Sequence, residues 1–179
     1  MRILTCIRLP DDIKQSLKND IARLKENAIS GKFTDDSELF IPLNDLGETS
    51  QTAGAKAIID RVSIPKFEQG IGGFGCTRKG TGDTYKEAIE MSDGLLDLQR
   101  QLQVGFTTAG YKVDTAPYKP FMVLCKDAKM KPGFNPQQFG ATIPFVSFEV
   151  ERVSLVRCDR VDGVYYYSEM CSVELPDDE

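Results

Sequence analysis

Two long segments of the chain place apolar residues every three or four positions, which predicts amphipathic helices over residues 11–27 and 92–109. In the first helix the apolar positions are Ile13, Leu17, Ile21 and Leu24. Asp11, directly after Pro10, is expected to cap that helix. A shorter, alanine-rich segment, residues 51–62, is also predicted to be helical.

The other apolar stretches are short and bounded by turn-forming residues, a pattern typical of strands. We predict strands over residues 2–9, 38–44, 66–76, 83–90, 119–126, 146–157 and 163–174. Residues 31–36 are predicted to form a turn, and residues 131–144, rich in proline and glycine, a connection.

The order of these elements predicts an α+β fold. A chain of 179 residues fits one domain, 1–179, made of two packed lobes. The strands at 38–44 and 119–126 each follow a predicted helix, which indicates two similar halves.

The amino-acid composition limits the classes of function that this protein can have. The formal net charge of −5 argues against a non-specific polyanion binder but leaves room for a local basic pocket that holds a small phosphorylated ligand. The five cysteines are scattered and the chain has no histidine, so neither a metal site nor a cofactor is expected. No apolar run approaches the roughly 20 residues of a membrane span, and no signal peptide is evident. We therefore expect a cytoplasmic protein without membrane contact.

Two of the predicted strands share a short pattern, Phe-x-x-Leu, which begins at Phe40 in FIPL and at Phe121 in FMVL. Alternate side chains of a strand point to opposite faces. Phe40 and Pro42 should therefore share one face of the first strand, and Phe121, Val123 and Cys125 one face of the second.

Two backbone features predict irregular strands. Pro42 cannot donate a ladder hydrogen bond, which favours an edge strand or a bulge. Four glycines at positions 70, 72, 73 and 75 superficially suggest a phosphate loop, but the Lys-Ser/Thr and the strand–loop–helix setting of such a loop are missing. A bulge or close strand packing is the better interpretation of these glycines.

Several segments taken together resemble a known family. They are MRILTCIRLP, GKFT followed by ELFIPLNDLGE, GIGGFG, the helix LLDLQRQL with the following AGY, YKPFMVLCK, and VERVSLVRCDRVDGVYYYSEM. In this order they resemble the LigT-like branch of the 2H phosphoesterases, the RNA 2′,3′-cyclic phosphodiesterases once called 2′-5′ RNA ligases. The resemblance implies two lobes, each with an antiparallel sheet and outer helices, that face one another across a central cleft.

That family is defined by two His-x-Thr motifs, one on the cleft strand of each lobe. One histidine acts as general base and the other as general acid on a cyclic phosphodiester, and the threonines donate hydrogen bonds to the phosphate. Carried onto this sequence, the histidine positions are Phe40 and Phe121, and the threonine positions are Pro42 and Val123. None of these four side chains can perform those roles. Since a general acid or base is worth about 10²–10⁴ in rate, the family reaction is expected to be lost.

The resemblance also implies which residues would contact a ligand in the cleft. The two phenylalanine rings could stack on nucleotide bases, and basic side chains near the ends of the cleft strands could contact phosphate. The expected ligand-binding residues are Phe40, Phe121, Arg8, Tyr118, Lys119, Cys125 and Lys126.

The sequence is compatible with three functions. In the first, the cleft binds a cyclic or phosphorylated nucleotide, or an RNA end, without cutting it. By analogy with phage members of the superfamily that destroy cyclic nucleotide immune signals, such a protein could be a sponge that evades anti-phage defence. The second is an enzyme with residual or altered phosphodiesterase chemistry that uses Tyr118, Lys119 or Cys125. The third is a structural protein with a collapsed groove, or one that docks a protein partner in it.

Overall fold

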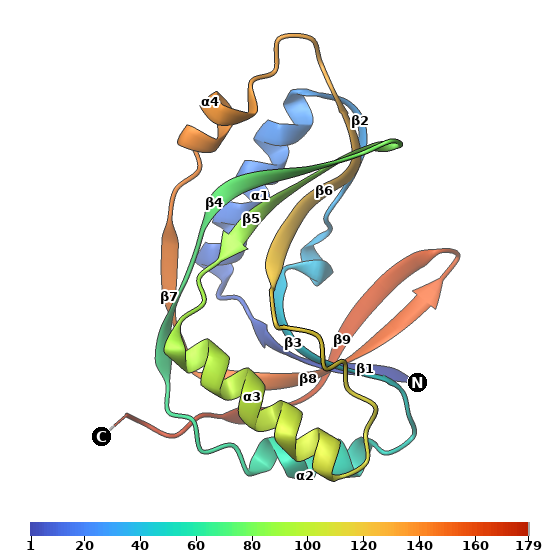
Figure 1. The fold of residues 1–179 in the computed structure, drawn as a ribbon, viewed down its shortest axis with the longest axis vertical. Helices are drawn as coiled ribbons and strands as arrows, with labels where there is room; N and C mark the ends of the chain where they lie inside the picture. The colour runs from blue at the N-terminus through green and yellow to red at the C-terminus, as the bar shows by residue number, and fades with distance from the viewer. Residues whose placement is uncertain (179) are drawn as a thin grey trace.

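The structure, a computed structural model that describes residues 1–178, contains two antiparallel sheets with helices on their outer sides (Figure 1). The four-stranded sheet has the spatial order β3 (Phe40–Glu48), β1 (Arg2–Arg8), β8 (Arg152–Val161) and β9 (Val164–Glu174). The five-stranded sheet has the order β2 (Ala28–Phe33), β6 (Phe121–Met130), β5 (Gly82–Ile89), β4 (Phe67–Lys79) and β7 (Val146–Val150). The predicted α+β fold is confirmed.

The helices pack on both sheets and bury their apolar stripes there. They are α1 (Asp11–Glu26), α2 (Thr52–Asp60), α3 (Asp93–Thr108) and the short α4 (Pro136–Ala141). The single 3₁₀ turn η1 (Asp36–Glu38) buries none of its residues. Helix α1 contacts the five-stranded sheet at β2, β6 and β7, whereas α2 contacts β8 and β9 of the other sheet. Within residues 1–178 no helix is both long and apolar enough to cross a membrane.

The two sheets do not correspond to the two halves of the sequence. The four-stranded sheet combines β1 and β3 from the beginning of the chain with β8 and β9 from its end. Every strand pairing within the two sheets is antiparallel. The chain therefore crosses repeatedly between the lobes, and the four-stranded lobe depends on segments from both ends of the sequence.

Three sequence predictions were wrong in detail. Part of the predicted turn at residues 31–36 belongs to β2, an edge strand whose pairing with β6 is irregular and whose side chains are all at least partly exposed, so it lacks a clear period of two. The predicted connection at 131–144 contains α4, which Asn135 caps by accepting hydrogen bonds from the backbone N–H groups of Gln137 and Gln138. The predicted strand 146–157 is two strands in different sheets, separated at Glu151.

The cap predicted for the first helix was also wrong. Asp11 is the first helical residue rather than the cap, and the preceding Pro10 offers no side-chain hydrogen bond. The Asp11 carboxylate still lies in the first turn of α1, together with Asp12. Negative charge at this end of a helix interacts favourably with the helix dipole.

The glycine-rich part of β4 is an irregular strand, as predicted. The register with β5 shifts between Ile71 and Phe74, and Gly73 lies there with a positive φ of 96°. A Cβ atom at Gly70 or Gly72 would collide with the ring of Phe145, so these two glycines allow close packing.

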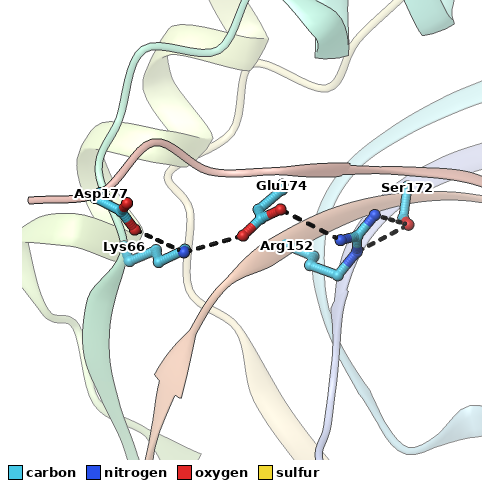
Figure 2. A network of polar contacts seen from close by, with 5 residues as sticks. All are labelled: Lys66, Arg152, Ser172, Glu174 and Asp177. Carbon is cyan, nitrogen blue, oxygen red and sulfur yellow. Dashed lines mark hydrogen bonds and ion pairs between the residues drawn. The ribbon is translucent and has the colours of Figure 1, made fainter.

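A polar network holds the end of the chain against the lobes (Figure 2). Lys66, which directly precedes β4 of the five-stranded sheet, places its Nζ atom 3.0 Å from Glu174 Oε1 and 2.8 Å from Asp177 Oδ1. Glu174 closes β9 of the other sheet and also lies 4.0 Å from Arg152. The network therefore joins the two sheets, although exposed ion pairs of this kind are individually weak.

Two buried carboxyl groups lie together between α1 and the five-stranded sheet. Asp20 is 3% exposed and Glu87 is fully buried. Burial, followed by the neighbouring Asp20 carboxyl, raises the pKa of Glu87 from its usual 4.5 to about 8. The guanidinium of Arg23, which donates to Asp20 Oδ1, opposes this shift.

We predict that this pair makes folding stability fall as pH rises. Between pH 4.5 and about 8 the folded chain keeps a proton at Glu87 that the unfolded chain has lost, so the free energy of unfolding decreases across this window. Glu87→Gln should flatten the profile and raise stability relative to wild type at pH 8. Urea unfolding at several pH values measures this, with Glu68→Gln, at an exposed residue on the same sheet, as the charge-matched control. An unchanged slope in Glu87→Gln would contradict the assignment.

Candidate functional site

The two sheets enclose an open cleft of about 940 Å³. Its walls come from β3 of the four-stranded sheet, the start of β6 in the five-stranded sheet, the loop that precedes β6, and the tip of the β8–β9 hairpin. This volume lies at the upper end of the roughly 300–1,000 Å³ range of ligand pockets. The groove is therefore not collapsed, and the phenylalanine side chains do not fill it.

Phe40 and Phe121, the two positions that the resemblance gives to catalytic histidines, both line this cleft. Their neighbours Ile41 and Met122 are 0% and 2% exposed, so the predicted alternation holds at these positions. Phe40 packs edge-on against Tyr167 with ring centroids 5.0 Å apart. Phe121 is 44% exposed and has the Lys86 ammonium 4.3 Å from its ring centroid. Such an exposed ring contributes little to the core and is free to contact a ligand.

Pro42 and Val123, the positions given to the threonines, also line the cleft. Strand β3 lies at the edge of its sheet, and its register with β1 shifts next to Pro42, so the sequence prediction of an edge or a bulge is confirmed. The carbonyls at both positions are already used. That of Pro42 accepts a 2.6 Å hydrogen bond from the Tyr118 hydroxyl, and that of Val123 accepts a 2.7 Å bond from Thr34.

The Tyr118–Pro42 hydrogen bond connects the loop before β6 to β3 of the opposite sheet. Burial raises the pKa of the Tyr118 hydroxyl, so it stays protonated and donates near neutral pH. Tyr118 therefore links the two walls of the cleft through this hydrogen bond.

The cleft is locally more basic than the chain as a whole. Five basic and four acidic side chains line it, whereas the chain carries a formal net charge of −5. The basic residues are Arg2, Lys32, Lys119, Lys126 and Arg160. Among them Arg2 is paired with Asp45 at 2.6 Å, so it is the least available to a ligand.

Glu38 adds an acidic group to the same lining. Burial, then the neighbouring Asp35, raises the pKa of its carboxyl, while Lys126 opposes the shift. Because Lys126 lies near Glu38, this part of the cleft lining carries both a basic and an acidic side chain.

Two of the seven expected ligand-binding residues lie outside the cleft. The strand alternation predicted for Cys125 was wrong, because an irregular register between β6 and β5 leaves Leu124 and Cys125 both fully buried. Burial raises the pKa of the Cys125 thiol to about 11. Arg8 lies instead beside an adjacent cavity of about 150 Å³, which shares Phe40 and Tyr167 with the cleft, and its guanidinium is 3.2 Å from the Glu169 carboxylate. Phe40, Phe121, Tyr118, Lys119 and Lys126 all line the same cleft, and their contact with a ligand stays a prediction.

Sequence reasoning missed the contribution of the last hairpin. Arg160, Val164, Tyr165 and Tyr167 of β8 and β9 line the cleft. The available signal was the run of three tyrosines shortly after the Asp162-Gly163 turn, which is unusual for an exposed hairpin tip.

Comparison with solved structures gives a clear result for the fold. Escherichia coli LigT in its apo form matches with a TM-score of 0.75 and 18% identity over 98% of both chains. The protein TT0787 of Thermus thermophilus matches with a TM-score of 0.78 and 19% identity over 100% of both chains. The chain has the LigT-like 2H-phosphoesterase fold.

A third match is Escherichia coli LigT complexed with 3′-AMP, with a TM-score of 0.72 and 18% identity over 97% of this chain and 96% of that one. LigT complexes with ATP and with NADP⁺ match in the same way. No family model matches the sequence, and no curated protein does either. At these identities the comparisons establish the fold alone.

We predict that Tyr118→Phe lowers the free energy of unfolding by about 1 kcal/mol, the net value of one intramolecular hydrogen bond. The substitution keeps the ring and removes only the donor to the Pro42 carbonyl. Urea unfolding at neutral pH measures the loss, and Tyr166→Phe, at an exposed tyrosine outside the cleft lining, is the matched control. Equal stability of the two variants would show that the bond does not support the cleft.

Proposed function

We propose that this chain is a non-cutting relative of the 2H phosphoesterases that binds a cyclic or phosphorylated nucleotide in its cleft. The observation that carries the proposal is the open cleft whose lining contains both Phe40 and Phe121 together with five basic side chains. An apolar-walled cleft with a few convergent polar groups is the usual form of a small-molecule site.

The chemistry of the lining suits a nucleotide. Stacking of a base on an aromatic ring is worth about 1–3 kcal/mol and needs no particular base. The ammonium groups of Lys119 and Lys126 supply positive charge for a phosphate, which this fold accommodates in LigT as part of 3′-AMP and ATP. The same features suit a free nucleotide, a cyclic nucleotide or a phosphorylated RNA end.

The groups present do not favour turnover. The chain has no histidine, so no side chain has an ordinary pKa near neutrality for acid–base catalysis. Burial raises the pKa values of both Tyr118 and Cys125, so neither is a ready nucleophile or base at pH 7. An altered phosphodiesterase would have to rely on Lys119 or on the acidic side chains of the cleft.

Binding without cutting points to a sensor or to a sequestering protein. A sequestering protein would lower the free concentration of a cyclic nucleotide signal, as a phage sponge against an immune signal would do in the host cytoplasm. This role requires tight binding, slow release and return of the ligand intact, and each of these properties can be measured.

The test is a calorimetric titration followed by chromatography of the recovered ligand. The panel contains mononucleoside 2′,3′-cyclic phosphates, cyclic di- and trinucleotides, and cyclic ADP-ribose isomers. We expect heat from at least one of these nucleotides and its recovery unchanged. Phe40→Ala and Phe121→Ala should each weaken binding about 5- to 150-fold through lost stacking.

Phe145→Ala is the matched control, because Phe145 is 65% exposed and does not line the cleft. Recovery of a cleaved ligand would replace the binding proposal by an enzyme with altered chemistry. Absence of heat from the whole panel would remove the nucleotide proposal.

A further inference from the structure

The β8–β9 hairpin forms a third wall of the cleft, in addition to the two cleft strands. Its tip projects beyond the neighbouring strands of its sheet (Figure 1). In the pairing of β8 with β9, Arg160 lies opposite Tyr165 and Cys158 lies opposite Tyr167. These four residues therefore share one face of the hairpin. That face is the one turned to the cleft, since Arg160, Tyr165 and Tyr167 all line it.

The tyrosines extend the aromatic surface that begins at Phe40. Tyr167 lies edge-on to Phe40 with centroids 5.0 Å apart, and Tyr165 precedes it by two residues, about 6.8 Å along the strand. One base covers only part of a row of three rings. A ligand that used the whole row would need a second base.

Arg160 supplies a cation at the outer end of this row. Its guanidinium lies 5.3 Å from the centroid of the Tyr165 ring. In the part of the chain that the structure describes, Arg160 forms no ion pair with a carboxylate. Guanidinium planes stack on bases and also pair with phosphates, so the Arg160–Tyr165 pair offers both contacts that a nucleotide unit needs.

We propose that Tyr165 and Arg160 form a second nucleotide subsite, so that the preferred ligand has at least two bases joined by a phosphodiester. This inference rests on the proposed nucleotide-binding function and specifies the ligand class. The first base is held at Phe40 and Phe121, and the hairpin holds the second. A mononucleotide reaches only the first subsite.

The hairpin itself provides a matched control. Tyr166, the neighbour of Tyr165, points to the opposite face, pairs in register with Asp159, and is 52% exposed without lining the cleft. Tyr165 is 40% exposed, so replacement of either tyrosine removes a similarly exposed ring. The two alanine variants therefore differ in which face loses its ring.

The experiment compares the affinities of 3′-AMP, the linear dinucleotide ApAp and cyclic diadenosine diphosphate for wild type, Tyr165→Ala, Tyr165→Phe and Tyr166→Ala. We expect Tyr165→Ala to weaken the two-base ligands about 5- to 150-fold while 3′-AMP changes less than about 2-fold. Tyr165→Phe keeps the ring and should retain affinity, and Tyr166→Ala should match wild type. The two-base ligand that loses more affinity in Tyr165→Ala, the linear or the cyclic one, shows which of the two forms the second subsite accepts.

Two results would overturn the inference while leaving the proposed function in place. One is binding of the two-base ligands no tighter than 3′-AMP. The other is an equal effect of Tyr165→Ala on one-base and two-base ligands, or no effect on either. If wild type binds none of the three ligands, the two-base inference is overturned as well, and the nucleotide panel described above decides the proposed function separately. Arg160→Gln adds an independent check, since it should reduce the salt dependence of two-base binding only.

Discussion

Side-chain alternation at the beginning of β3 and β6 is the constraint on which the site depends. Ile41 and Met122 are committed to the core, and burial of a large apolar side chain is worth about 1.5–3 kcal/mol. Because neighbours on a strand point to opposite faces, this burial turns Phe40 and Phe121 into the cleft. Packing of the adjacent residues therefore places both rings in the lining of the cleft, even though neither ring can take part in proton transfer.

Contacts between segments far apart in the sequence keep the cleft open. The Tyr118 hydroxyl bonds across to β3, and Tyr167 holds the ring of Phe40 edge-on. Elsewhere Lys66 joins the end of β9 to the approach to β4. A cleft that is already formed lowers the cost of ordering on binding, so the available stacking and charge can contribute more fully to affinity.

The spacing of apolar residues predicted the long helices and the strands that carry Phe40 and Phe121, because these elements bury apolar side chains at regular intervals. It could not place Cys125, because a bulge reverses the face of a side chain without changing the composition of the strand. Arg8 was misplaced because a distant strand supplies Glu169, a partner invisible to local sequence. The position of Tyr165 in the cleft lining was missed for a similar reason, since the pairing of β8 with β9 determines which tyrosines face the cleft.

The most direct measurement is an NMR experiment on the protein with 2′,3′-cyclic AMP, combining intermolecular proton contacts with the phosphorus spectrum of the ligand. We expect contacts between base protons and the ring protons of Phe40 or Phe121, and a cyclic phosphodiester signal that persists unchanged. Contacts confined to residues outside the cleft would contradict the binding site. Appearance of a phosphomonoester signal that depends on the protein would contradict the absence of cutting.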